Sequence, residues 1–404
     1  MRLDIAPIIS ALRRHRITSV LLIMQIALTC AIVCNAVFLV ADRLSWMDTP
    51  SGIDEDRIAA IRLSAPGKGV DVHARAETDM AVLRAVNGIE DVSTINSLPF
   101  NGRSWTTDVR LDLSEKVPFA SMAQYYGERA AQLLGAQLQE GGWIRPDEYA
   151  WIDDVATKRV ASSGVVMLTQ PAAKHLFPGR SAIGQTIYMG DDGYRVVGIV
   201  RRLASAGGDR ATIGEAILTP FRMVPTYGAG YVIRTAPGQA GSVLNAAAAA
   251  LKKVDPRRVV TEKTTFSEIR RNFFAGDRAL SAMLVGACVV LLAITALGIV
   301  GLASFWVAQR RRQIGVRRAL GATRGDVLRH FQTENFLLAS MGILLGMALA
   351  YAMNVVLMLH YEIPRLPWGY LPGAAILLWI VGQLAVLAPA LRAASVSPVE
   401  ATRG

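Results

Sequence analysis

The sequence is poor in the residues that most binding and catalytic sites use. It has three cysteines, all inside long apolar runs, and five scattered histidines with no two at metal-ligand spacing. We therefore expect no disulfide scaffold and no metal site. The sequence also contains no G-x-x-x-x-G-K-[ST] phosphate loop, no G-x-S-x-G elbow and no S-x-x-K pair. We accordingly predict no catalytic residue and no cofactor bound by this chain.

Charged residues are scarce as well, at 19% of the 404 residues against 52% hydrophobic residues. About 25% charged residues is usual in a soluble domain. Four runs, each longer than the roughly 20 residues that cross a hydrocarbon core, carry no charge. The first is too long for a signal peptide and has no A-x-A site after it. We expect transmembrane helices at 17–41, 279–308, 335–359 and 371–391.

Polar residues are rare within these apolar runs. They contain no carboxylate, so a proton-coupled carrier would lack its usual relay. Gln25, Asn35 and Gln383 are present, and such residues are more typical of hydrogen bonds between helices than of substrate ligands. We expect these three side chains to join neighbouring helices.

The basic charge is concentrated in three short segments. The net charge is +11, of which +9 belongs to residues 1–16, 309–334 and 392–404. Because Lys and Arg flank transmembrane helices on the cytoplasmic side, we expect both termini and the 309–334 loop to be cytoplasmic. Residues 42–278 and a short loop at 360–370 are then outside. The rest of the chain has a net charge of only +2, so we expect no basic surface for nucleic acid. The arginines of the cytoplasmic loop can contact the phosphates of membrane lipid.

The outer segment, 42–278, has a β-α-β pattern at each end. The first pattern runs through 57–63, 77–86 and 91–95, and the second through 231–235, 239–253 and 258–261. Two such units predict a ferredoxin-like subdomain. Between them, Thr169 is the expected N-cap of a helix, and residues 185–200 have a hairpin pattern. The predicted fold is an α-helical membrane protein with four transmembrane helices plus a large α+β periplasmic domain, in which a mostly-β subdomain is inserted into the ferredoxin-like one.

The end of the outer segment predicts a long helix. Thr265 and Glu268 have the spacing of a capping box, and no proline occurs between 266 and 307. A continuous helix of that length would measure about 60 Å, roughly twice the hydrocarbon thickness. We expect the second transmembrane helix to extend outward from about 266 as a stalk. The alternative is a kink near Gly276, with the outer piece a separate surface helix. The predicted stalk residues are Glu268, Phe273, Phe274 and Gly276.

The cytoplasmic loop holds the most informative motif, at 310–328. A short helix is expected to end at Gly321, after which Thr323 can cap a new helix with Asp326. Apolar contacts for the short helix are expected from Ile314, Val316, Ala319 and Leu320. A positive-inside anchor alone would explain the arginines, but not the Ile-Gly pair at 314–315 or the Ala-Leu-Gly-Ala run at 319–322.

With this loop the sequence resembles the MacB/FtsX-like permeases of type VII ABC transporters. The family motif is approximately R-x-x-E-I-G-x-x-R-A-x-G-A, and residues 310–322 match it, with Gln313 where the family usually has Glu. The ion pair of that Glu is therefore in doubt, although a hydrogen bond could replace it. Further stretches similar to the family lie at 176–179, 183–187, 196–200 and 392–401.

The resemblance implies that the loop is a coupling helix seated on an ATPase. The implied coupling residues are Gln313, Ile314, Gly315, Arg317, Arg318, Ala319, Leu320, Gly321 and Ala322. MacB itself carries an ATPase domain before its first span. Only sixteen residues precede the first apolar run here, so we expect a separate ABC ATPase subunit that holds ATP and Mg²⁺.

The resemblance also implies partners and a location. A second permease protomer is expected, as a homodimer or a heterodimer with a paralogue, and an adaptor resembling MacA is a candidate periplasmic partner. The implied function in the bacterial inner membrane is mechanotransmission, in which ATP hydrolysis moves the outer domains to export a peptide or amphiphilic compound. The alternatives are an FtsX-like regulator of a cell-wall hydrolase and a LolC-like lipoprotein-release permease.

Overall fold

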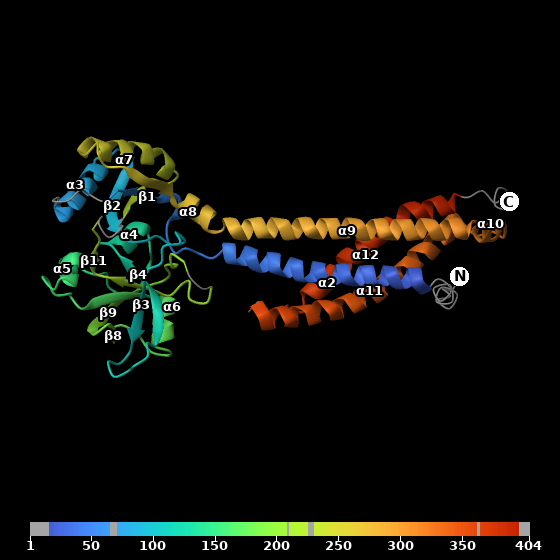
Figure 1. Ribbon diagram of the computed structural model, residues 1–404, viewed down its shortest axis with the longest axis horizontal. Helices are drawn as coiled ribbons and strands as arrows, with labels where there is room; N and C mark the ends of the chain where they lie inside the picture. The colour runs from blue at the N-terminus through green and yellow to red at the C-terminus, as the bar shows by residue number, and fades with distance from the viewer. Residues whose placement is uncertain (1–15, 65–70, 208–209, 225–229, 362–363, 396–404) are drawn as a thin grey trace. The chain divides into compact units, whose positions relative to one another are not determined.

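The computed structural model describes residues 16–64, 71–207, 210–224, 230–361 and 364–395 (Figure 1). The chain forms two compact units. A helical unit combines residues 1–47 with 276–404, and an outer unit contains residues 48–275.

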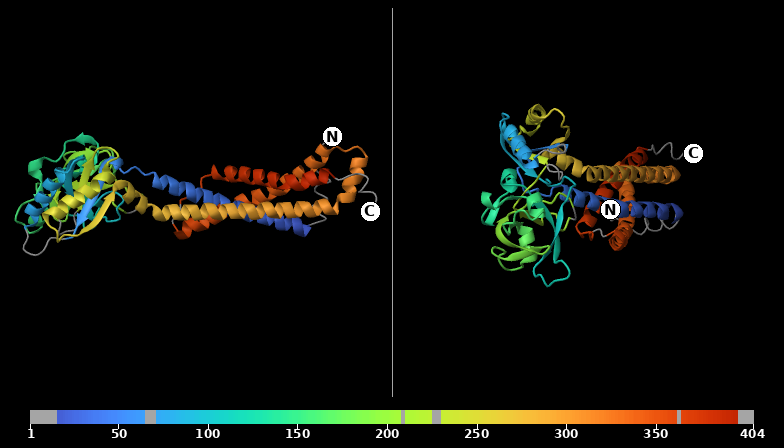
Figure 2. Two further views of the ribbon diagram at one scale, coloured as in Figure 1. Left: turned by 90° about the horizontal axis from the view of Figure 1, so that it is seen from above. Right: turned by 60° about the vertical axis from the view of Figure 1, so that its left-hand side comes forward.

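The helical unit is built from long apolar helices that run side by side in both views of Figure 2. Within the described residues, four helices are long and apolar enough to cross a membrane, which confirms the expected number of apolar helices. They are longer than the uncharged runs because their charged ends continue the same helical turns. The helices of this unit are α2 (Arg16–Met47), α9 (Ala275–Gln309), α10 (Arg311–Ala319), α11 (Arg324–Tyr361) and α12 (Tyr370–Ala394).

Close contact between α2 and α11 depends on two glycines four residues apart. A Cβ on Gly342 would lie 2.8 Å from Cβ of Ile26, and one on Gly346 would lie 2.5 Å from Cβ of Cys30. Small residues at this spacing let two membrane helices approach closely. This pair is absent from the predictions made from the sequence, although its G-x-x-x-G spacing inside an apolar run is a signal for such a contact.

Polar side chains also join the long helices of this unit to one another, as predicted. The Gln25 side chain donates to the Ile294 carbonyl oxygen on α9 at 3.2 Å. The Asn35 side chain donates to the Ala350 carbonyl oxygen on α11 at 3.1 Å. The Gln383 side chain donates to the carbonyl oxygen of residue 332 on α11 at 3.3 Å. All three amides therefore act between helices.

The outer unit contains a four-stranded antiparallel sheet in the order β13-β1-β12-β2. Each β-α-β unit places its two strands on either side of a strand from the other unit, which is the ferredoxin-like order and confirms that prediction. In Figure 1, α3 and α7 lie on one side of these strands, and buried leucines at 83, 244 and 251 belong to the core there. The elements are β1 (Ile58–Leu63), α3 (Val72–Arg84), β2 (Ile89–Ile95), β12 (Gly230–Thr235), α7 (Ala240–Val254) and β13 (Val260–Thr265).

A second, seven-stranded sheet forms the inserted subdomain, in the order β5-β9-β7-β10-β4-β3-β8. An additional pairing of β8 with β9 closes the sheet into a ring around its own core. The strands are β3 (Thr106–Arg110), β4 (Ala120–Tyr126), β5 (Leu138–Gly141), β7 (Val165–Thr169), β8 (Thr186–Met189), β9 (Asp192–Val200) and β10 (Ala216–Thr219). Shorter elements are η1 (Glu55–Arg57), α4 (Ala130–Leu134), η2 (Pro146–Glu148), β6 (Ala150–Trp151), α5 (Ile152–Ala156), α6 (Gln170–Leu176) and β11 (Phe221–Arg222).

Two local predictions in this subdomain are confirmed. The Thr169 side chain accepts a hydrogen bond from the Ala172 amide at the start of α6. The hairpin expected within 185–200 is formed by β8 and β9, which pair Met189 with Asp192 across a two-residue turn.

The continuous helix expected from 266 to 307 is wrong. Helix α8 (Phe266–Phe273) ends before Phe274, whose φ of −90° and ψ of 12° leave the helical region, and α9 begins at Ala275. The alternative, a break near Gly276 with a separate outer helix, describes the chain better. Even so, the 35 residues of α9 measure about 52 Å, more than the hydrocarbon thickness of about 30 Å.

Candidate functional site

The predicted coupling loop forms a short helix, α10, with defined ends. Arg310 has a φ of −100° and a ψ of 9°, which separates α10 from α9. At the other end the Leu320 amide donates to the Val316 carbonyl oxygen at 3.0 Å. Gly321 follows with a φ of +99°, a conformation that glycine adopts readily and other residues do not. The sequence prediction of a helix ending at Gly321 is confirmed.

A reciprocal cap then starts α11. The Asp326 amide donates to Oγ1 of Thr323 at 3.2 Å, and the Thr323 amide donates to Oδ2 of Asp326 at 3.0 Å. This is the predicted capping arrangement. Backbone groups are therefore hydrogen-bonded both at the end of α10 and at the start of α11.

One residue, Ile314, anchors α10 to the helical unit. Its side chain is 6% exposed and belongs to a core formed with α11 and the end of α12. Of the four apolar side chains expected to give this helix its contacts, Ile314 is the one that packs in this core. Val316 is 45% exposed and Leu320 is 83% exposed, and Ala319 is also exposed. A helix of nine residues can turn only one face inward, so these three form part of the outer face.

The other predicted coupling residues divide between the two faces of this loop. Gln313 and Gly321 are exposed, Gly315 is buried, and Arg318 and Ala322 are half-buried. The side chain of Arg317 lies outside the described part of the chain. Arg311 and Arg312 are also exposed. The outer face of α10 therefore combines apolar side chains with guanidinium groups.

An ion pair holds the start of α10. Nη1 of Arg310 lies 3.2 Å from both carboxylate oxygens of Glu334, and the Arg310 guanidinium lies 5.7 Å from the Trp306 ring centroid. Glu334 is 1% exposed. From the sequence, Glu334 is expected to end the cytoplasmic loop at 309–334, next to the apolar run that begins at residue 335. The structure instead places it inside α11 and the helical core, where a charge requires a partner.

The predicted stalk residues in the outer unit belong to an aromatic cluster. The rings of Phe273 and Phe274 each lie 5.3 Å from the Phe100 ring. The guanidinium of Arg270 lies over Phe100 at 5.2 Å and donates to Glu55 at 2.6 Å. This cluster ties α8 to the segment by which the chain enters the outer unit.

The capping box at the start of α8 is confirmed, since the Thr265 amide donates to Oε2 of Glu268 at 2.9 Å and the Glu268 amide donates to Oγ1 of Thr265 at 3.3 Å. The bond from the Thr265 amide is the main reason that the pKa of Glu268 is lowered. In the helical unit, Gly276 has open space where a Cβ would be. The next residue, Asp277, pairs with Arg43 of α2.

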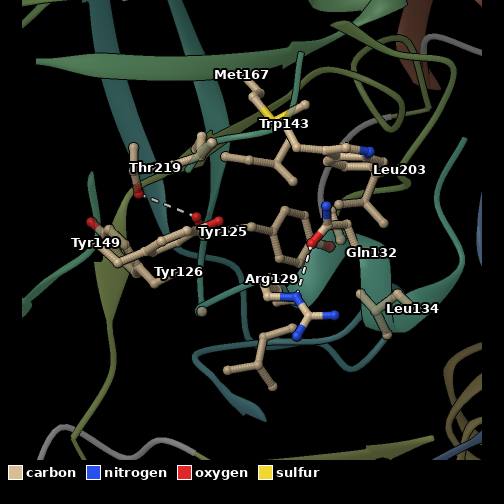
Figure 3. A pocket seen from close by; sticks show the side chains of 16 residues that line it. Tyr125, Tyr126, Arg129, Gln132, Leu134, Trp143, Tyr149, Met167, Leu203 and Thr219 are labelled. Atoms are coloured by element: carbon tan, nitrogen blue, oxygen red, sulfur yellow. Dashed lines mark hydrogen bonds between the residues drawn. The ribbon is translucent and has the colours of Figure 1, made fainter. Parts of the chain in front are cut away.

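A narrow pocket in the outer unit is lined by aliphatic side chains together with four aromatic ones, at 125, 126, 143 and 149 (Figure 3). Burial raises the pKa of Tyr126 to about 12 and also raises that of Tyr125, so both phenols stay neutral. Thr219 donates to the Tyr125 carbonyl oxygen at 3.2 Å, and Nε of Arg129 donates to Gln132 at 3.2 Å. The pocket offers aromatic faces more than reactive groups.

Two family models match the chain. One, described as the MacB-like periplasmic core domain, matches residues 21–254. The other, described as the FtsX-like permease C-terminal region, matches residues 285–398. Together they cover both units.

Curated relatives are similar at modest identity. The chain is 25% identical over 354 residues to the macrolide export ATP-binding/permease protein MacB of Shewanella oneidensis, which covers 83% of this chain and 51% of that protein. It is 28% identical over 253 residues to the pyoverdine export ATP-binding/permease protein PvdT of Pseudomonas putida, covering 61% of this chain and 38% of that protein. The chain thus spans about half or less of the length of these relatives.

Two solved structures show limited similarity to the outer unit. The periplasmic region of MacB from Actinobacillus actinomycetemcomitans matches with a TM-score of 0.34 and 15% identity, over 55% of this chain and 94% of that one. The extracellular domain of the noncanonic ABC-type transporter YknZ from Gram-positive bacteria matches with a TM-score of 0.32 and 13% identity, over 51% of this chain and 100% of that one.

Proposed function

The chain belongs to the family of FtsX-like ABC transporter permeases with a MacB-like periplasmic core domain, and we propose that it couples a separate ABC ATPase to movement of that domain. In this proposal the ATPase subunit binds ATP and Mg²⁺. Both chain termini and α10 face the cytoplasm, and the outer unit lies in the periplasm. The positive charge around α10 supports this orientation.

The observation that carries the proposal is the outer face of α10. Its Val316 and Leu320 side chains are exposed although Ile314 of the same helix is buried. An apolar surface rimmed by arginines is typical of a protein interface. In our proposal the ATPase covers this surface, and the exposed residues within 313–322 form the contact.

The helical unit supports transmission of a movement from α10. Arg310 pairs the start of α10 with Glu334 of α11, and Ile314 of α10 packs in one core with residues of α11 and α12. A displacement of α10 would therefore shift α9 and α11 together. The interhelical bonds and the close packing at Gly342 and Gly346 favour movement of whole helices over local bending.

A second permease protomer is part of the proposal. Helix α9 exposes large apolar side chains along much of its length, including Met283, Val289 and Leu297. Its most apolar segment is 11% buried, against 50% for α2. We propose that α9 packs against its counterpart in the second protomer, which is a second copy of this chain or a paralogue.

We further propose export of a peptide or amphiphilic compound, with a MacA-like adaptor as a periplasmic partner. The relatives named for macrolide and pyoverdine export support export over the alternatives. An FtsX-like regulator of a cell-wall hydrolase or a LolC-like lipoprotein-release permease would use the same coupling without efflux. Export of labelled peptide from vesicles that contain the whole complex distinguishes these functions.

The coupling step can be tested by co-expressing the chain with a candidate ABC ATPase subunit from the same genome. We expect Ala319→Asp with Leu320→Asp to abolish co-purification and the stimulation of ATP hydrolysis, because the charges face the proposed interface. Leu113→Asp is the control, since Leu113 is an exposed apolar residue in the outer unit. If the double variant forms the complex and stimulates ATP hydrolysis as the unmodified chain does, the coupling assignment is wrong.

A further inference from the structure

One histidine and two aspartates converge between the two sheets of the outer unit. Nε2 of His73 lies 2.9 Å and 3.0 Å from the two carboxylate oxygens of Asp153. Nδ1 of His73 lies 4.0 Å from Oδ2 of Asp154. One donor atom from each of the three residues falls within 4.8 Å of the others. The residues are about 80 positions apart in the sequence, so their spacing could not reveal the cluster.

His73 is held in place from two sides. Asp71 caps the start of α3 by accepting from the His73 amide at 3.0 Å. The imidazole ring stacks on the indole of Trp151, with centroids 4.4 Å apart and an interplanar angle of 5°. Further along α3, Leu83 is buried in the core of the ferredoxin-like sheet. The imidazole is therefore fixed relative to that sheet.

The two aspartates are fixed relative to the other sheet. They occupy the first turn of α5, and Ile152 and Val155 of the same helix pack against the core of the seven-stranded sheet. Arg159 lies 3.5 Å from Oδ1 of Asp154, which leaves Oδ2 as the oxygen closer to the imidazole. All three side chains of the cluster are half-buried, which limits competition from water.

We propose that His73, Asp153 and Asp154 bind a divalent transition-metal ion, with Zn²⁺ as the chemically best match. One imidazole nitrogen and two carboxylate oxygens, completed by water, form a donor set that Zn²⁺ accepts. Zinc needs these donors about 2.0–2.2 Å from the ion, so the Asp154 oxygen, now 4.0 Å from the imidazole, would move closer when the ion binds. This proposal departs from the expectation of no metal site and does not depend on the proposed transport function.

The ion would join the two sheets at the edge of a cleft. Trp151, which holds His73, also lines this cleft together with Arg84, Asp91, Glu128 and Arg222. The Arg222 guanidinium lies 5.8 Å from the Trp151 ring and pairs with Glu128. A bound metal ion would therefore resist separation of the sheets and hold one wall of the cleft.

A second histidine provides a matched control. Nδ1 of His175 lies 2.9 Å from Glu215, as an ordinary histidine–carboxylate pair. It does not belong to a group of three donors among the described residues. A substitution at His175 therefore removes an equivalent ion pair without touching the proposed site.

The test is metal titration of the full chain in detergent, purified without a histidine tag and stripped with EDTA. We expect one Zn²⁺ per chain by calorimetry, Co²⁺ absorption bands of a low-symmetry site, and a higher unfolding temperature with Zn²⁺. His73→Gln, Asp153→Asn and Asp154→Asn should each weaken binding about tenfold or more, while His175→Gln should not. Circular dichroism shows whether each variant is folded.

Two results would overturn the proposal. One is no saturable binding by the unmodified chain, in which case His73 and Asp153 form only an ion pair. The other is binding that the folded Asp154→Asn and His73→Gln variants retain in full, which identifies an adventitious ion at another place. The isosteric Asp154→Asn variant keeps the test decisive if the His73 variant does not fold.

Discussion

Nη1 of Arg310 lies 3.2 Å from each carboxylate oxygen of Glu334, and Glu334 is almost completely buried in the helical unit. Arg310 directly precedes α10, and Glu334 lies within α11, so the pair joins these two helices. Trp306, one turn earlier on α9, covers the guanidinium. The contact between α10 and α11 therefore includes a buried charge pair.

Arg310→Ala should destabilise the chain strongly. Removing one partner of a buried ion pair leaves the other charge unpaired, at a typical cost of about 3–5 kcal/mol. The double variant Arg310→Met with Glu334→Met removes both charges and should cost much less. Thermal unfolding in detergent measures both. Equal losses for the single and double variants would show that the pair contributes through packing and not through charge.

Gly346→Val should separate α2 from α11. Its Cβ would lie 2.5 Å from Cβ of Cys30, so the helices must move apart. Overpacking of this kind typically costs about 1–3 kcal/mol. Gly286→Val on α9 is the control, because a Cβ there has open space. Unfolding temperatures of the two variants should differ clearly, and similar values would refute the close contact.

The stability contributed by the Glu268 charge should depend on pH. Hydrogen bonding to the Thr265 amide lowers the pKa of Glu268 in the folded chain. A lowered folded pKa gives stability that is present above the unfolded pKa of about 4.3 and is lost as the pH falls through the folded pKa. Glu268→Gln should therefore lower the unfolding temperature at pH 7, and the difference should shrink as the pH is lowered towards 3. A constant difference across this range would contradict the charge assignment.

The proposed dimer should be accessible to cross-linking at the outer end of α9. Ala275 and Ala279 are exposed there, and we expect a single cysteine at either position to form a disulfide with its counterpart when two copies assemble. The native cysteines are buried and can stay. Maleimide labelling confirms that the new thiol is reactive. A reactive thiol that never cross-links, with or without a paralogue present, would exclude pairing along this end of α9.

The sequence predicted the regular parts of the fold because their signals are local. Strands at 57–63 and 231–235 and the helices after them have clear patterns, and the pairing of β1 with β12 confirms the order that they implied. The caps at Thr169 and Thr323 were equally visible. Closure of the second sheet by β8 and β9 was not, because the direction in which a sheet curls depends on contacts between distant segments.

The errors arose where tertiary packing overrides local preference. The helix breaks at Phe274, whose ring packs against Phe100 from a distant loop. The sequence treated Glu334 as a loop residue because it is charged, whereas Arg310 allows it to be buried. The sequence also did not show which apolar side chain of α10 faces inward, because that depends on contacts with α11 and α12; Ile314 does, and Val316 and Leu320 are exposed.

Site-specific photocross-linking from α10 to the ATPase tests the central claim most directly. A photoreactive amino acid at Leu320 or at Val316 should cross-link to the ATPase subunit in the assembled complex, because both positions are exposed on the outer face. The same amino acid at Leu113 should not. Cross-links from 316 and 320 alone would support α10 as the coupling helix. A complex that assembles and hydrolyses ATP without cross-links from either position would contradict it.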